Sequence, residues 1–80
     1  MKPDWKRPLA RVLRLKGGEE LRTLRDAGEF AQRRWGQVRK SAAIQHTVEL
    51  LMRAAETGDA GDIAEATAQL EHTLVSRHEI

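Results

Sequence analysis

Glycines divide this chain of 80 residues into short segments, and their positions limit the folds available to it. Gly17-Gly18 lies between two short runs rich in leucine and is typical of a turn between antiparallel strands. Gly36 and Gly58 each follow a longer segment with helical spacing of apolar residues, and glycine commonly ends a helix. The sequence therefore predicts an α+β fold, with an N-terminal two-stranded antiparallel hairpin over residues 9–24 packed on three α-helices.

The length of the hairpin loop decides which side chains face the helices. A three-residue loop over residues 17–19 would place Leu15 opposite Leu21. Arg14 would then face Arg22 on the other side of the hairpin, which separates leucines from arginines. A two-residue loop would pair leucines with charged residues, so we expect the longer loop. An isolated hairpin is not stable in water, and helices must therefore cover its leucine face.

Three helices follow from the apolar periodicity and from residues suited to cap them. The first is predicted over residues 24–35, with Thr23 as its N-cap. The second is predicted over residues 41–57, beginning at a serine N-cap. Its apolar residues cover roughly 200° of its circumference, so it should be the central helix. The third is predicted over residues 62–76, with Asp59 as an alternative cap for an earlier start.

The chain should form one domain with a thin core. We expect a compact unit over residues 9–77, between a mobile N-terminal arm at residues 1–8 and a tail at residues 78–80. Two prolines favour an extended arm, and its Trp5 either packs back on the domain or stays exposed. Because the chain has no cysteine, no disulfide supplements this core, and small domains often gain stability by association.

The sequence contains no sign of a membrane segment. No apolar run approaches the roughly 20 residues that a bilayer-spanning helix needs. The first fifteen residues contain basic side chains but no continuous apolar stretch, so they do not predict a secretory signal. We therefore expect a cytoplasmic protein with no membrane partner.

Charge is divided unevenly along the chain. Residues 1–40 contain twelve basic and five acidic side chains, a net charge of +7, whereas residues 41–80 contain two basic and seven acidic side chains, a net charge of −5. Such asymmetry indicates either a half that binds a polyanion or two surfaces that attract each other.

The basic half offers candidate phosphate contacts at Arg25, Arg33, Arg39 and Lys40. An ordinary charged helix face is the alternative interpretation, because Glu29 lies four residues from both Arg25 and Arg33 and can pair with either. A helix-turn-helix interpretation is disfavoured, since its recognition helix would be the second one, whose polar face contains acidic residues.

No constellation of residues predicts catalysis, a metal site or a cofactor. His46, His72 and His78 project from different faces, and none has the partner one helical turn away that a metal-binding helix requires. The two serines, Ser41 and Ser76, lie at predicted helix ends without a nucleophile motif around them. We therefore expect a protein that is not an enzyme.

Several short motifs occur in a recognisable order. They are a strand ending Arg14-Leu15-Lys16-Gly17-Gly18, a strand ending Thr23-Leu24, a helix that opens Asp26-Ala27-Gly28-Glu29-Phe30 and closes Arg34-Trp35, an alanine-rich helix ending Glu56-Thr57-Gly58, and a last alanine-rich helix. In this order the chain resembles a small alphaproteobacterial family known as domain of unknown function 982. The family often has proline after the tryptophan, where this chain has Gly36. The resemblance implies a compact α+β domain and transfers no catalytic residue.

These observations favour a small bacterial protein-interaction or regulatory module that self-associates, because association would supplement a thin core. The alternative is a nucleic-acid-binding protein that uses the basic N-terminal half. The homo-oligomer, an unidentified protein partner and nucleic acid are thus the partners to test.

Overall fold

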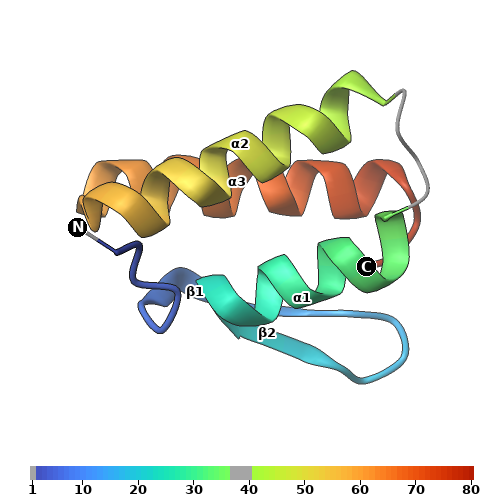
Figure 1. Ribbon diagram of the computed structural model, residues 1–80. Coiled ribbons are helices and arrows are strands. Elements are labelled where there is room, and N and C mark those ends of the chain that lie inside the picture. Colours follow the sequence, from blue (N-terminus) through green and yellow to red (C-terminus); the bar gives the residue numbers. More distant parts are fainter. Residues whose placement is uncertain (1, 37–40) are drawn as a thin grey trace.

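The structure, a computed structural model, describes residues 2–36 and 41–80 and has the predicted α+β architecture. A two-stranded antiparallel sheet is followed by three helices (Figure 1). In chain order the elements are β1 (Pro8–Arg14), β2 (Glu20–Thr23), α1 (Leu24–Trp35), α2 (Ala42–Thr57) and α3 (Ala60–Ser76).

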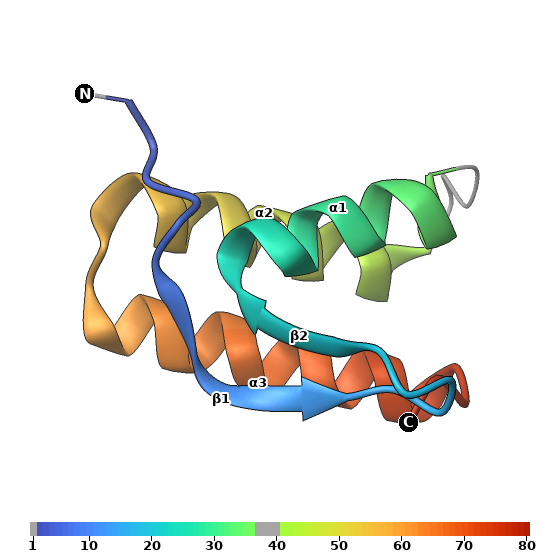
Figure 2. The same cartoon turned by 90° about the horizontal axis from the view of Figure 1, so that it is seen from below.

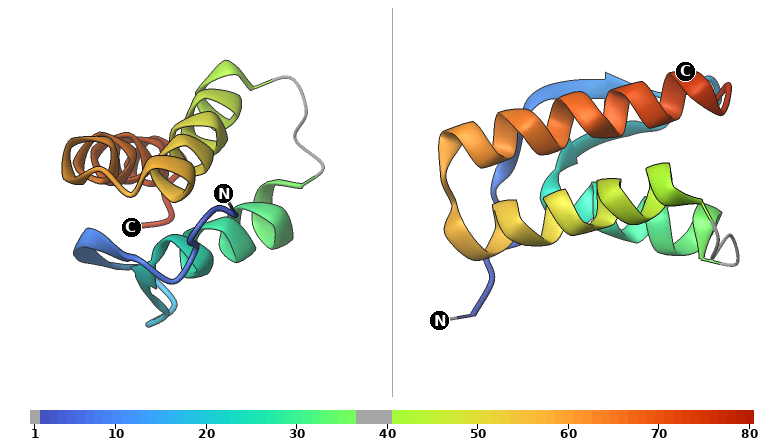
Figure 3. Two further views of the ribbon diagram at one scale, coloured as in Figure 1. Left: turned by 60° about the vertical axis from the view of Figure 1, so that its left-hand side comes forward. Right: turned by 90° about the horizontal axis from the view of Figure 1, so that it is seen from above.

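The elements form two layers. Helices α2 and α3 lie side by side in one layer, and α1 and the hairpin form the other (Figure 1). Seen from below, α1 runs over α2 and the hairpin runs over α3 (Figure 2), and two further views show the same arrangement from the side and from above (Figure 3). Because α2 packs on both α1 and α3, the prediction of a central second helix is confirmed.

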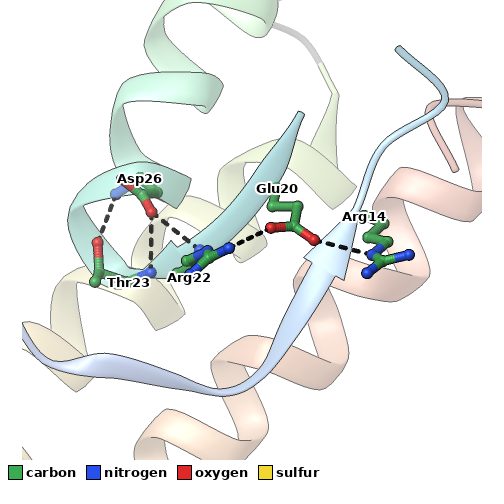
Figure 4. Close-up of polar contacts among 5 residues, drawn as sticks. All are labelled: Arg14, Glu20, Arg22, Thr23 and Asp26. Atoms are coloured by element: carbon green, nitrogen blue, oxygen red, sulfur yellow. Dashed lines mark hydrogen bonds and ion pairs between the residues drawn. The ribbon is translucent and has the colours of Figure 1, made fainter. Parts of the chain in front are cut away.

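The start of α1 is fixed by a reciprocal cap (Figure 4). The Thr23 hydroxyl accepts a hydrogen bond from the Asp26 backbone N–H at 3.1 Å, and the Asp26 carboxylate accepts one from the Thr23 N–H at 3.3 Å. The same carboxylate oxygen also accepts the Arg22 N–H at 3.0 Å. The cap satisfies N–H groups that the helix itself leaves without partners, and the predicted bounds of α1 are confirmed.

Local caps also set the ends of α2 and α3. The Ser41 hydroxyl accepts the Ile44 N–H at 3.3 Å, and Gly58 ends α2 in the left-handed conformation with φ of 64°. Helix α3 begins two residues earlier than Asp62, because the Asp59 carboxylate accepts the N–H groups of Gly61 and Asp62. The structure thus has the earlier of the two predicted starts.

The hairpin is present, but its predicted register is wrong. Leu13 lies opposite Leu21, and the Leu15 N–H donates to the Glu19 carbonyl at 2.8 Å. The three-residue loop therefore covers residues 16–18 and not 17–19. The third loop residue of such a turn has a left-handed conformation, and Gly18 adopts it with φ of 91°. The predicted loop would have imposed that conformation on a glutamate.

The observed register also separates two like charges. Arg14 faces Glu20 and not Arg22. The Glu20 carboxylate accepts a hydrogen bond from Arg14 at 2.9 Å and one from Arg22 at 2.6 Å (Figure 4). Opposite charges across a strand pair stabilise it, whereas two arginines directly opposite would repel each other.

Strand β1 is irregular and lies on α3. Its pairing with β2 shifts between Pro8 and Leu13, and residues in this stretch bond to α3. The Ala10 N–H donates to the Thr67 hydroxyl at 3.0 Å, and the Arg11 guanidinium pairs with the Glu71 carboxylate. These contacts hold the strand where its buried leucines enter the core.

The core lies between the two layers and consists mainly of leucine and alanine. The fully buried leucines are Leu13, Leu21, Leu24, Leu51, Leu70 and Leu74, and two aromatic side chains, Phe30 and Trp35, are each 3% exposed. Two buried hydroxyls join α2 and α3, because Thr47 Oγ1 and Thr73 Oγ1 are 2.9 Å apart. Thr47 also donates to the Ala43 carbonyl at 2.8 Å, which makes Thr73 the donor in the pair.

Both terminal segments lie against the domain. The Asp4 N–H donates to the Ala55 carbonyl at 2.8 Å, and the Arg25 N–H donates to the Trp5 carbonyl at 2.7 Å. Trp5 packs against the core, which decides between the two positions that the sequence allowed. Strand β1 already begins at Pro8, inside the segment assigned to the arm.

The last residues turn back toward the hairpin. The Glu79 carbonyl accepts the Lys16 N–H at 2.8 Å, and the Glu79 N–H donates to the Leu74 carbonyl at 2.8 Å. These bonds join the segment assigned to the tail with both α3 and the hairpin loop.

Candidate interaction groove

An open groove runs between the N-terminal arm, α1 and α2, with a volume of about 950 Å³. Its apolar lining comes from all three segments: Trp5 from the arm, Ala31 and Trp35 from α1, and Ile44, Val48, Leu51 and Met52 from α2. Apolar clefts of this size are the usual places where proteins bind other molecules. We call it the arm groove.

The arm reaches this position because α1 has a glycine beneath it. A Cβ atom added to Gly28 would lie 3.2 Å from Cζ3 of Trp5, closer than ordinary van der Waals contact. The absence of a side chain at Gly28 therefore lets the indole ring lie directly on the helix backbone. Two features of the sequence could have indicated this contact: a glycine inside a helix and a tryptophan in the arm.

Trp35 lies at the other end of α1 and is 3% exposed. Its ring meets Phe30 edge to face, with centroids 5.2 Å apart and planes at 83°. Trp35 thus belongs to the hydrophobic core. Among the described residues its Nε1 has no hydrogen-bond partner.

Met52 lies at the outer edge of the arm groove and is 47% exposed. Glu49 lies three residues before it and Glu56 four residues after it, so both carboxylates lie on the same side of α2, each about one helical turn away. In the described part of the chain neither carboxylate makes an ion pair, including with Arg53, the residue that follows Glu49 by one turn.

The arm closes the groove at the C-terminal end of α2, where the Asp4 N–H bonds to the Ala55 carbonyl, and it adds positive charge there. Lys2 and Lys6 both line the groove and are exposed. Over residues 2–36 and 41–80, neither lysine has an ion-pair partner. The arm groove is therefore an apolar surface bordered by charged side chains of both signs, which are Lys2, Lys6, Arg25, Asp4 and Glu29.

The two predicted phosphate contacts that the structure describes are both engaged in ion pairs. Arg25 pairs with Glu29 at 2.7 Å, and Arg33 pairs with Glu19 at 2.7 Å. Arg39 and Lys40 lie outside the described residues. The pair of Arg25 with Glu29 was visible in the sequence as a spacing of four residues. The pair of Arg33 with Glu19 depends on how the hairpin loop approaches α1.

Among residues 2–36 and 41–80, two ion pairs connect the basic half of the chain with its acidic half. Arg11 on β1 pairs with Glu71 on α3, and Arg34 on α1 makes two hydrogen bonds of 3.0 Å to the Glu79 carboxylate. Part of the charge asymmetry is thus compensated within one chain, as one of the two sequence interpretations allows.

The electrostatics of the Glu79 carboxylate follow from this contact. Hydrogen bonds from Arg34 lower the pKa of Glu79; its partial burial opposes that effect, and the positive charge of Arg34 and the indole N–H of Trp35 reinforce it. The Trp35 N–H does not reach hydrogen-bond geometry, so Arg34 is the partner that holds this carboxylate. The same bonds raise the pKa of Arg34.

Glu20 has a similar environment on the outer face of the hairpin. Hydrogen bonds from Arg22 and then from Arg14 lower the pKa of Glu20, and the bond from Glu20 raises the pKa of Arg22. Both shifted carboxylates are held by arginines in structural pairs. Neither has the raised pKa of a carboxyl group prepared for acid catalysis.

The described residues hold no cluster of three or more histidine or acidic side chains close enough to ligate a metal ion. Within those same ranges, no helix has the length and apolarity to cross a bilayer. Comparison with family models, with curated proteins and with solved structures finds no match to this chain. The resemblance to domain of unknown function 982 stays a prediction.

Proposed function

We propose that this protein is a non-enzymatic protein-interaction or regulatory module that self-associates through an apolar surface. The observation that carries the proposal is the arm groove, with two tryptophans in its lining and a half-exposed methionine at its edge. Exposed apolar grooves bordered by charged residues are typical of interaction sites, and tryptophan is enriched where binding energy concentrates.

The distribution of polar groups supports a binding role over catalysis. His46, His72 and His78 are exposed and belong to separate parts of the surface. The polar side chains at the edges of the arm groove are lysines, an arginine, a glutamine and carboxylates, without a nucleophile beside a base. Cytoplasmic residence and kinship with domain of unknown function 982 are part of this proposal.

Nucleic-acid binding is the alternative function, and the charge of the N-terminal half favours it. The ion pairs weigh against it. A phosphate that binds Arg25 or Arg33 must share the guanidinium with a glutamate that already accepts a hydrogen bond from it at 2.7 Å, and the two anions repel each other. Exposed ion pairs are weak, at about 0–1 kcal/mol, so this opposition is modest for each contact.

Sedimentation equilibrium of the purified protein distinguishes the two functions. We expect a concentration-dependent dimer or higher oligomer at micromolar concentration in low salt. Added duplex DNA or RNA should not co-sediment with it. A strict monomer at high micromolar concentration in low salt would contradict self-association. If that monomer bound DNA or RNA with affinity falling steeply against salt concentration, the nucleic-acid function would replace our proposal.

A further inference from the structure

We propose that the residues that hold the Glu79 carboxylate form a recognition site for an acidic side chain of a partner protein, and that the tail, residues 78–80, occupies this site in the free protein. The site consists of the Arg34 guanidinium, the Trp35 indole and the backbone N–H of Lys16, and we call it the tail site. It differs from the arm groove, although Trp35 belongs to both, and it does not require self-association.

The tail site contacts both the side chain and the backbone of one acidic residue. Arg34 donates from Nε and from Nη2, each at 3.0 Å, to the two oxygens of the Glu79 carboxylate. This planar fork matches the geometry of a carboxylate, and the Glu79 side chain is only 16% exposed within it. The Lys16 N–H donates to the Glu79 carbonyl at 2.8 Å, a backbone bond of the kind that peptide recognition uses. The site therefore holds a glutamate as part of a peptide chain.

One donor of the tail site is not used by the tail. Trp35 is 3% exposed, and among the described residues its Nε1 has no hydrogen-bond partner. The indole N–H nevertheless lies close enough to the Glu79 carboxylate to lower its pKa. Buried donors in folded proteins are nearly always hydrogen-bonded, so this exception calls for an explanation. A carboxylate that approaches from a separate chain can bond to Arg34 and to this N–H together.

The backbone of the tail is strained. His78 has φ of 60°, and in the described part of the chain it is the residue other than glycine with a positive φ. A residue with a Cβ rarely adopts this left-handed conformation, and such strain is common at switch segments and ligand clamps. The chain needs this turn because it must reverse after α3 to bring Glu79 back to Arg34 (Figure 1). An acidic residue of a partner needs no such turn, so it binds the tail site without this strain.

The charge around Arg34 favours a single carboxylate over a nucleic acid. Glu19 lies close enough that its negative charge helps to raise the pKa of Arg34. A single carboxylate pairs with the guanidinium alone, whereas a nucleic acid brings several phosphates close to Glu19, which repels them. The tethered tail competes with any partner at an effective concentration that is roughly millimolar for a short linker. The partner must therefore present its acidic residue within a segment that makes further contacts.

A peptide tests the tail site in the full chain. The variant Glu79→Ala frees the guanidinium, and the probe is a peptide of residues 74–80, acetylated and amidated so that its glutamate is its only anionic group. We expect the peptide to bind this variant roughly tenfold more tightly than the unaltered protein, in which the tail competes. NMR titration measures the affinity, and the indole N–H resonance of Trp35 should shift while that of Trp5 does not. Addition of Arg34→Gln to the variant should abolish binding.

Two controls isolate the carboxylate. A peptide with Glu79→Gln should not bind measurably at the same concentration. The protein variant Glu29→Ala removes an exposed carboxylate that pairs with Arg25 elsewhere on α1, and it should bind the probe no better than the unaltered protein does. Circular dichroism shows whether Glu79→Ala is folded. If it is not, the protein variant Glu79→Gln takes its place, since it keeps the size of the side chain and removes its charge.

The outcomes separate this inference from the proposed function. A folded variant that does not bind the probe, or that binds the glutamine peptide equally well, overturns the inference and leaves self-association standing, because the arm groove is unaltered. Tighter binding of inorganic phosphate than of the peptide also overturns it and favours the nucleic-acid alternative. A strictly monomeric protein whose Glu79→Ala variant binds the probe supports this inference and overturns self-association alone.

Discussion

Gly28 lowers the stability of its own helix, but it makes room for Trp5 from a distant part of the chain. Glycine in a helix interior is about 1 kcal/mol less favourable than alanine. The structure shows what compensates, since the Trp5 ring occupies the space beside the helix backbone, and its nearest atom is 3.2 Å from where a Cβ would lie. The helix gives up some intrinsic stability, and the arm gains a surface on which its tryptophan packs.

We predict a coupling between these two positions. Gly28→Ala in a Trp5→Ala background should stabilise the protein by about 0.5–1 kcal/mol, since only the helix preference remains. In the unaltered background the gain should shrink or reverse, because the new methyl group displaces the ring. Urea denaturation of the four proteins in a double-mutant cycle measures the difference. Equal effects in both backgrounds would show that the ring does not press on Gly28.

A second residue-scale prediction concerns the hydroxyl pair between α2 and α3. Thr47 and Thr73 are 0% and 1% exposed, so each hydroxyl depends on protein partners. Thr47→Val alone should cost about 1–3 kcal/mol, because it leaves the buried Thr73 hydroxyl without its acceptor. Thr47→Val combined with Thr73→Val should be close to neutral, since no hydroxyl of the pair is then left unsatisfied. Thermal melts of the two variants test this, and a double variant less stable than the single one would contradict it.

The roles of residues that bond to near neighbours in the chain could be predicted from the sequence. Thr23 and Gly58 cap helices through atoms a few residues away, so their roles follow from the local sequence. Arg33 and Arg34 find partners 14 and 45 residues away, at Glu19 and Glu79. No spacing rule connects such pairs, because they depend on how elements pack.

At the scale of the element, the hairpin shows where prediction from sequence ends. The Gly17-Gly18 pair between two short leucine-rich runs identified both strands. The loop contains two adjacent glycines, so the sequence is compatible with more than one register. Which register forms depends on which loop residue adopts the left-handed conformation. Gly18 does so, with φ of 91°. The prediction chose the loop only by separating leucines from arginines, and it did not consider this backbone requirement. The predicted loop is therefore displaced by one residue from the observed one.

The two loop glycines therefore differ in a testable way. Gly18→Ala should destabilise the protein by about 1–2 kcal/mol, the cost of a left-handed conformation for a residue with a Cβ. Gly17→Ala is the matched control, since a Cβ there meets no atom within 4 Å and its φ is not positive. It should leave the free energy of unfolding almost unchanged. Equal losses in the two variants would mean that the loop does not have the observed register.

At the scale of the whole molecule, the terminal segments complete both the fold and the candidate site. The arm groove exists only because the arm bonds to Ala55 and Arg25, and the tail is held by Arg34 and Lys16. The sequence suggested an arm and a tail from prolines and position. It contained no local signal for their contacts, so the groove was not among the predicted sites.

The Arg34–Glu79 pair predicts a dependence of stability on pH. The pKa of Glu79 is lowered in the folded protein, so this pair stabilises the fold above the ordinary glutamate pKa of about 4.3. That contribution is lost as pH falls from there through the lowered folded-state pKa. Glu79→Gln should therefore be less stable than the unaltered protein at pH 7, and the difference should narrow by pH 3. Urea denaturation at the two pH values measures it.

The matched control for this experiment is Glu65→Gln. Glu65 is exposed and makes no ion pair within the described residues. The difference between this variant and the unaltered protein should be small at both pH values. A Glu79→Gln difference that stays constant between pH 7 and pH 3 would show that the tail is not held by the ionised carboxylate.

Because β1 packs on α3, it cannot complete its contacts until the end of the chain has been synthesised. Ala10 and Arg11 bond to Thr67 and Glu71, 57 and 60 residues further along the chain. A ribosome adds roughly 5–20 residues per second, so the leucines of β1 emerge several seconds before the helix that covers them. Contacts between such distant residues also form slowly. Until α3 emerges, Leu9 and Leu13 lack the helix that covers them in the folded protein.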